Sequence, residues 1–216
     1  MKPRANSPEA RAAVSVDLMR RSDAYTIENF VESKELMYRA AMGVYNAVAW
    51  KDGARVAIFC GSGNNGGDGY ALAAILQENG YHPTIFCVSE KFSDDGQYYC
   101  RMAKERGVPI CPFTEETVID ADYAVDCIFG TGFHGTPRGA AAAAIEKINA
   151  SAAYTVSVDI NSGMNGDTGE AVLAVKSDLT VSIGFYKTGH FSGRAQQLIG
   201  DLVNVDIGII LLPDGK

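Results

Sequence analysis

The sequence predicts one α/β domain in which helices cover both faces of a mostly parallel sheet. Short apolar runs typical of buried strands alternate along the chain with segments of helical periodicity. Three of these runs end in turns rich in Gly, Asn, Asp, Ser or Thr. The length of 216 residues suits a single domain with a sizeable core.

The N-terminal part of the chain is expected to precede the sheet. Residues 1–14 are predicted to be a flexible segment, and residues 15–216 to form the domain. Apolar residues at helical spacing predict helices over 16–30 and 33–49, and Ser33 is a candidate N-cap of the second. The first strand is predicted at 56–60, so the two helices extend a core of the nucleotide-binding type.

The rest of the chain alternates regularly between strands and helices. A helix over 70–76 is expected to end at Asn79-Gly80, a common helix stop. Two further helices are predicted over 97–106 and 140–148. The remaining predicted strands are 84–88, 108–111, 123–129, 155–158, 179–183 and 202–205.

Charge and cysteine content restrict the class of protein. A net charge of -7 without a basic stretch argues against nucleic acid as a partner. Five scattered cysteines without a C-x-x-C pair are expected to be free thiols in a reducing compartment. The chain shows neither a signal-peptide pattern nor a membrane-length apolar run, so we expect a cytoplasmic protein without a membrane partner.

The most informative segment is the glycine-rich loop predicted over 61–68, between a buried strand and a helix. A helix N-terminus behind such a loop favours anions, because free N–H groups and peptide dipoles point toward the ligand. An ordinary dehydrogenase is disfavoured, because Glu90 poorly matches the acidic residue expected about twenty positions on. Asn64, Asn65 and Asp68 are not needed for phosphate binding alone and indicate additional chemistry.

Three strand ends carry oxygen-bearing side chains that are expected to lie near one point. Asn65, Asp126 and Ser162 follow different strands, and the carboxyl ends of parallel strands share one edge of the sheet. One carboxylate among neutral oxygens suits a weakly held large cation better than Mg²⁺. The alternative is that Asp126 and Ser162 only cap neighbouring helices or turns.

Asp159 ends another predicted strand and is a candidate acid or base. Its alternative role is to form the turn that follows. Lys187 either reaches a phosphate or is a solvated surface residue. His134 and His190 lie in glycine-rich loops. Each is able to shuttle a proton, but a solvated histidine is the more common case in such a loop.

Several ordered blocks resemble the YjeF N-terminal domain, the NAD(P)H-hydrate epimerase family. The most specific is Gly61-Ser62-Gly63-Asn64-Asn65-Gly66-Gly67-Asp68-Gly69, similar to the family's G-x-G-N-N-G-G-D-G. Segments 126–132, 159–163, 178–181 and 187–189, and the upstream 36–43, also resemble the family, so the likeness extends over about 16–207. One departure is Asn161, where the family commonly has proline.

The resemblance implies a Rossmann-like three-layer α/β/α sandwich, often a homodimer, that interconverts the R and S epimers of NAD(P)HX for cofactor repair. It implies K⁺ at Asn65, Asp126 and Ser162, one ion per subunit. It also implies a separate NAD(P)HX dehydratase as functional partner. The substrate contacts that it implies are Asn64, Asn65, Gly66, Gly67, Asp68, Gly130, Thr131, Gly132, Phe133, His134, Gly135, Thr136 and Asp159.

The expected chemistry is loss and return of water at C6 of the hydrated nicotinamide, with Asp159 as acid and then base. Asp68 is a second candidate, and ring opening is an alternative route. A non-catalytic nucleotide-binding or protein-interaction module of the same fold is the rival function. The presence of Asp68, Asp126 and Asp159 favours the enzyme.

Overall fold

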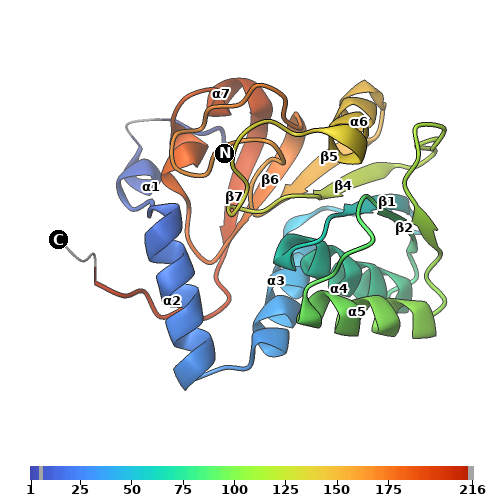
Figure 1. Ribbon diagram of the computed structural model, residues 1–216, viewed down its shortest axis with the longest axis horizontal. Helices are drawn as coiled ribbons and strands as arrows, with labels where there is room; N and C mark the ends of the chain where they lie inside the picture. The colour runs from blue at the N-terminus through green and yellow to red at the C-terminus, as the bar shows by residue number, and fades with distance from the viewer. Residues whose placement is uncertain (5–6, 214–216) are drawn as a thin grey trace.

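The computed structural model describes residues 1–4 and 7–213 and contains a seven-stranded sheet between two layers of helices (Figure 1). Every strand pair is parallel, and the strand order is β3-β2-β1-β4-β5-β6-β7. The strands are β1 Arg55–Cys60, β2 His82–Cys87, β3 Ile110–Pro112, β4 Tyr123–Cys127, β5 Tyr154–Val158, β6 Ser177–Ile183 and β7 Ile199–Val205. The expectation of a mostly parallel sheet is confirmed, and strand order reverses between β1 and β4.

The helices are α1 Pro8–Arg11, α2 Val16–Asn29, α3 Ser33–Ala47, α4 Asn64–Glu78, α5 Asp94–Glu105, α6 Gly139–Ala150 and α7 Ala195–Leu198, with a 3₁₀ turn, η1, at Thr188–Phe191. Figure 1 shows α3, α4 and α5 on one side of the sheet and α6 and α7 on the other. None of the described helices is long and apolar enough to cross a membrane.

Side chains of β1 alternate between two separate cores, which explains its uninterrupted apolar sequence. Val56, Ile58 and Cys60 belong to the large core under α2 to α5. Ala57 and Phe59 belong to the core on the opposite face, with Ile145 of α6. A strand covered on both faces needs an apolar residue at every position, because successive side chains point to opposite faces.

The predicted glycine-rich loop is shorter than expected, because α4 already begins at Asn64. The expectation of a loop over 61–68 and a helix from 70 was therefore wrong at this boundary. A Cβ on Gly66 would lie 2.2 Å from the carbonyl oxygen of Gly61, and one on Gly69 2.7 Å from Sγ of Cys60. The glycines thus let α4 approach the loop and the ends of the strands closely.

The first helices differ from the expected boundaries by a few residues. Ser15 caps α2, since its hydroxyl accepts the N–H of Leu18 at 3.1 Å. Ser33 is the first helical residue of α3 and not its cap, because Glu32 occupies that position without a side-chain bond. Within the segment 1–14 that the sequence predicts to be flexible, the structure places α1 and a parallel bridge from Val14 to Lys187. Residues 5–6 lie outside the described residues.

Candidate active site

A cavity of about 590 Å³ lies at the carboxyl ends of the strands, next to the reversal of strand order. The loop after β1, the loop after β4 and the ends of β5 and β6 provide part of its wall. Helices α2 and α3 provide most of the remaining wall, largely with apolar side chains such as Leu36 and Met37. An apolar pocket with a few convergent polar groups at this point of a parallel sheet is typical of a ligand site.

Asp159 enters this pocket from the end of β5 with an unusual backbone conformation. Its φ is 68°, and it is the only non-glycine residue with positive φ in the described part of the chain. The N–H of Asp159 donates to the carbonyl of Val181 at 2.8 Å. Left-handed backbone at a non-glycine residue costs free energy and occurs preferentially at functional sites.

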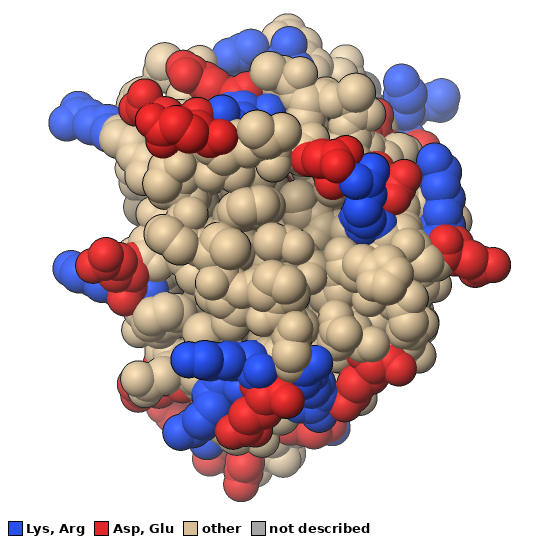
Figure 2. Space-filling view, turned by 90° about the vertical axis from the view of Figure 1, so that its right-hand side faces the viewer, with Lys and Arg blue, Asp and Glu red and all other residues tan. Residues whose placement is uncertain are grey.

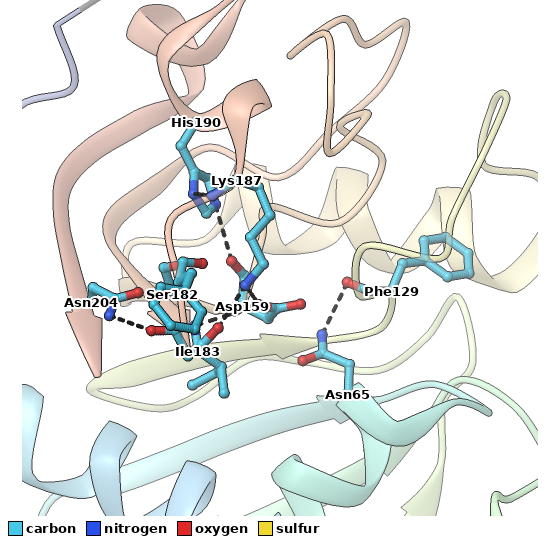
Figure 3. Close-up of polar contacts among 10 residues, drawn as sticks. Asn65, Phe129, Asp159, Ser182, Ile183, Lys187, His190 and Asn204 are labelled. Carbon is cyan, nitrogen blue, oxygen red and sulfur yellow. Dashed lines mark hydrogen bonds and ion pairs between the residues drawn. The ribbon is translucent and has the colours of Figure 1, made fainter. Parts of the chain in front are cut away.

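Lys187 is buried, with 1% of its surface exposed, and its ammonium forms an ion pair with Oδ1 of Asp159. Nζ also donates to the carbonyl of Ile183 at 2.8 Å. Both Asp159 and Lys187 line the pocket, and Figure 3 shows the lysine reaching down to the carboxylate. Of the two expectations for Lys187, the solvated surface residue was wrong, because its ammonium is buried against a carboxylate.

His190 contacts the backbone of both Asp159 and Lys187 and holds the pair in place. It is fully buried, its Nε2 lies 3.0 Å from the carbonyl oxygen of Asp159, and its Nδ1 accepts the N–H of Lys187 at 3.2 Å (Figure 3). These two contacts require the neutral tautomer with the proton on Nε2. Burial, followed by the positive charge of Lys187, lowers the pKa of His190 to about 3. The expectation of a solvated histidine was wrong at this position.

Three further carboxylates line the pocket: Asp68 from α4, Asp23 from α2 and the partly exposed Asp95 from α5. Burial, and then the negative charge of Asp159, raise the pKa of Asp68 and of Asp23. The Lys187 ammonium opposes this rise in each case. Among the carboxylates that line the pocket, Asp159 is therefore held against a cation, whereas Asp68 and Asp23 favour the protonated form more than usual.

The predicted oxygen cluster is present behind the pocket wall. Asp126 is fully buried and accepts four hydrogen bonds, and burial raises the pKa of its carboxyl group. The donors are the N–H and Oγ of Ser162, at 2.9 and 2.5 Å, the Oγ of Ser157 at 2.9 Å and the N–H of Ile128 at 3.2 Å. The carboxylate thereby ties the ends of β4 and β5 together.

Asn65 completes this cluster from α4. Its Nδ2 donates to the carbonyl of Phe129 at 3.0 Å (Figure 3). Oγ of Ser162, whose hydrogen goes to Asp126, lies 3.3 Å from the same carbonyl oxygen. Its Oδ1 is buried and has no hydrogen-bond partner among the described residues. An unpartnered buried oxygen is costly, so it marks a place where a ligand or ion belongs.

The structure brings only part of the predicted substrate set to the pocket. Asn64, Asn65, Asp68, Gly130, Thr131, Gly132, Phe133 and Asp159 line it. His134, Gly135 and Thr136 are exposed and do not line it. Gly66 and Gly67 face the Gly61 carbonyl and Met37, so their observed role is close packing.

Asn161, at the family's proline position, is fully buried and makes a network of its own. Its Nδ2 lies 3.0 Å from the carbonyl of Val175, 3.0 Å from Oγ of Ser177 and 3.2 Å from the carbonyl of Leu198. Its Oδ1 accepts from Oγ1 of Thr180 at 2.7 Å. The side chain therefore anchors the 159–163 turn to β6 and α7, and does not close the turn locally.

Fold and pocket together define a parallel-sheet α/β protein of the nucleotide-binding type, with a buried carboxylate–ammonium pair beside a glycine-rich loop. The family model described as "YjeF-related protein N-terminus" matches residues 33–189. This chain belongs to that family, and the resemblance noted in the sequence is confirmed.

Three relatives illustrate the extent of the match. The NAD(P)H-hydrate epimerase of Limosilactobacillus fermentum is 34% identical over 200 residues, which are 90% of this chain and 96% of that protein. The bifunctional NAD(P)H-hydrate repair enzyme Nnr of Archaeoglobus fulgidus is 36% identical over 176 residues, 81% of this chain but 37% of that longer protein. The crystal structure of yeast ynu0 superposes with a TM-score of 0.75 at 23% identity, covering 89% of this chain and 86% of ynu0, and supports the fold.

Proposed function

We infer that this protein is an NAD(P)H-hydrate epimerase, an isomerase that interconverts the R and S epimers of NAD(P)HX. Relatives with this name match nearly the whole chain. The observation that carries the inference is the Asp159–Lys187 pair, which lies in the pocket that the family's glycine-rich segment helps to form. Such a pair holds a proton ready where it can meet a bound ring.

In the proposed route, the C–O bond at C6 breaks and a new one forms on the other face of the ring. Asp159 transfers the proton that it shares with Lys187 to the C6 hydroxyl, which leaves as water with the C–O electron pair. The lone pair of the ring nitrogen forms a C=N⁺ bond, and the anionic Asp159 stabilises this cation. A water molecule adds to the opposite face of C6, gives its proton to a base in the pocket, and completes the other epimer.

The glycine-rich loop is the proposed site for the phosphates of the substrate. The loop residues Ser62 and Gly63 and the first helical residue Asn64 line the pocket at the N-terminus of α4. This 15-residue helix directs its unpaired N–H groups and dipole toward the cavity. The loop over 129–133 places the stacked rings of Phe129 and Phe133, 4.2 Å apart, on another part of the wall.

We propose K⁺ as the resident ion of the cluster that contains Asn65, Asp126 and Ser162. The unpartnered Oδ1 of Asn65 and the carbonyl of Phe129 are neutral oxygens suited to a large monovalent cation. Asp126 has its oxygens filled by hydrogen bonds, so it joins the ion only if Ser162 redirects its hydroxyl. When bound, K⁺ supplies a fixed positive charge that orders the loop after β4.

The proposal extends to partners and compartment. An epimerase of this type works with a dehydratase that consumes one epimer, and the Nnr relatives are named as bifunctional repair enzymes. The five free cysteines suit a reducing cytoplasm.

We also propose a homodimer. The face in Figure 2 supports it, because charged side chains gather near its upper and lower edges and the middle is largely uncharged.

The test is epimerisation of pure (R)-NADHX by the purified protein, with K⁺ and with Na⁺ in its place, followed by chromatography. We expect conversion above the spontaneous rate, faster with K⁺, and a loss of at least about 100-fold in Asp159→Ala with binding retained. The rival function, a non-catalytic binding module of the same fold, predicts binding without conversion. Full activity of the Asp159→Ala variant would remove this residue from the mechanism.

A further inference from the structure

Helix α2 forms one wall of the pocket, and a single carboxylate stands in the middle of that wall. The α2 residues that line the cavity recur at helical spacing and are Val16, Met19, Arg20, Asp23 and Ile27. Asp23 lies one turn from Met19 and one turn from Ile27, which are both apolar. A position in such a stripe normally carries an apolar residue.

Asp23 has no structural role that explains its presence there. The residue is half-buried, and within the described part of the chain its carboxylate accepts no hydrogen bond and forms no ion pair. A partly desolvated carboxylate without a partner is unfavourable unless it meets a ligand. Asn65 lines the same cavity, and its buried Oδ1 has no hydrogen-bond partner among the described residues. A second polar group of this cavity therefore also lacks a partner that a ligand could supply.

The proposed reaction needs a proton-handling group on each side of the ring. Water leaves from one face of C6 and returns to the other, and a side chain reaches only the face that it adjoins. Asp159 and Lys187 come from the ends of the strands, and Asp23 comes from α2, a different wall. A ring bound between these walls would present one face to each.

We propose that Asp23 is a second catalytic carboxylate, which receives the proton of the water that adds to the face of C6 turned away from Asp159. The inference rests on the proposed epimerase function and assigns the base left unnamed there. In the reverse direction, Asp23 gives that proton to the hydroxyl of the other epimer, water leaves, and Asp159 accepts the proton of the returning water. Atoms and charge balance in both directions. Before a second turnover in the same direction, Asp23 releases its proton to solvent and the Asp159–Lys187 pair takes one up, so water is the only other reactant.

The charges around Asp23 suit this role. Burial, and then the negative charge of Asp159, raise the pKa of Asp23, and the ammonium of Lys187 opposes the rise. A raised pKa lets a carboxylate accept a proton from water and return it within one cycle near neutral pH.

The test follows the oxygen at C6 as well as its configuration. Wild type, Asp23→Asn, Asp68→Asn and the exposed α2 control Glu28→Gln are each incubated in H₂¹⁸O with (R)-NADHX and, separately, with (S)-NADHX. Chromatography gives the rate of epimerisation, and mass spectrometry gives the rate at which ¹⁸O enters the unconverted epimer. Both rates are corrected for the reaction without protein.

For Asp23→Asn we expect epimerisation to fall at least about 100-fold. One of the two epimers should still exchange its oxygen within about threefold of the wild-type rate, because Asp159 still serves its own face. Glu28→Gln should match wild type in both measurements. Equal loss of exchange for both epimers, unchanged epimerisation, or selective loss in Asp68→Asn in place of Asp23→Asn would overturn the assignment.

The same data separate this inference from the proposed function. A wild-type protein that epimerises neither substrate refutes the epimerase function, and the role of Asp23 falls with it. A wild type that epimerises without taking up ¹⁸O indicates ring opening. This result overturns the loss and return of water, including the roles of Asp159 and Asp23 in that route, but not the epimerase function. An active wild type with an equally active Asp23→Asn refutes only the second carboxylate.

Discussion

Acidification from about pH 7.5 to about pH 5 is expected to destabilise the fold by about 2 kcal/mol through His190 alone. Burial and the Lys187 charge lower the pKa of His190 from 6.5 to about 3 in the folded protein. Between these two values the unfolded chain binds a proton that the folded protein does not. Stability therefore increases with pH up to about 6.5, is level above it, and is lost progressively as the pH falls toward 3.

The physical reason lies in the two contacts of the ring. Nδ1 accepts the N–H of Lys187, so a proton on Nδ1 would place one donor against another in a fully buried site. His190→Asn removes the titrating group and should remove the corresponding pH dependence. The comparison uses the difference between wild type and variant, which cancels the contribution of the carboxylates that titrate in the same range.

The assay is urea unfolding at both pH values for wild type, His190→Asn and the control His134→Asn. His134 is exposed on the loop after β4, so its replacement should leave the pH dependence as in wild type. The wild type should lose about 2 kcal/mol more than His190→Asn between the two pH values. Equal losses in wild type and His190→Asn would refute the buried neutral imidazole.

Two further predictions concern the network around the pocket. Lys187→Met should lower the free energy of unfolding by about 3 kcal/mol, because Asp159 loses its buried cation. The double variant Lys187→Met/Asp159→Asn should recover most of this loss in urea unfolding. A double variant as unstable as Lys187→Met would contradict the pairing. Asn161→Pro should lower the free energy of unfolding, measured with urea, by about 2 kcal/mol, because Thr180 and Ser177 lose a buried hydrogen-bond partner. An unchanged urea midpoint would show that the hydrogen bonds of Asn161 do not stabilise the turn.

Much of the architecture follows from local sequence. The strand β1 is apolar at consecutive positions because both of its faces are covered, and the alternation of strands and helices indicates a parallel sheet. The segment from Gly61 to Gly69 placed the pocket at the correct edge of the sheet. Its boundary between loop and helix was missed, because glycine normally disfavours a helix and only the packing of α4 on its neighbours favours it here.

Tertiary structure alone decided which polar side chains become part of the site. Lys187 and His190 stand in a short glycine-containing segment that is typical of an exposed loop, and their burial depends on contact with Asp159, far away along the chain. In the sequence, Asp23 is only one acidic residue of an amphipathic helix. The way α2 packs in the folded protein places this residue in the pocket. Periodicity fixes which residues share a face, whereas burial and charge pairing depend on what the folded chain packs against that face.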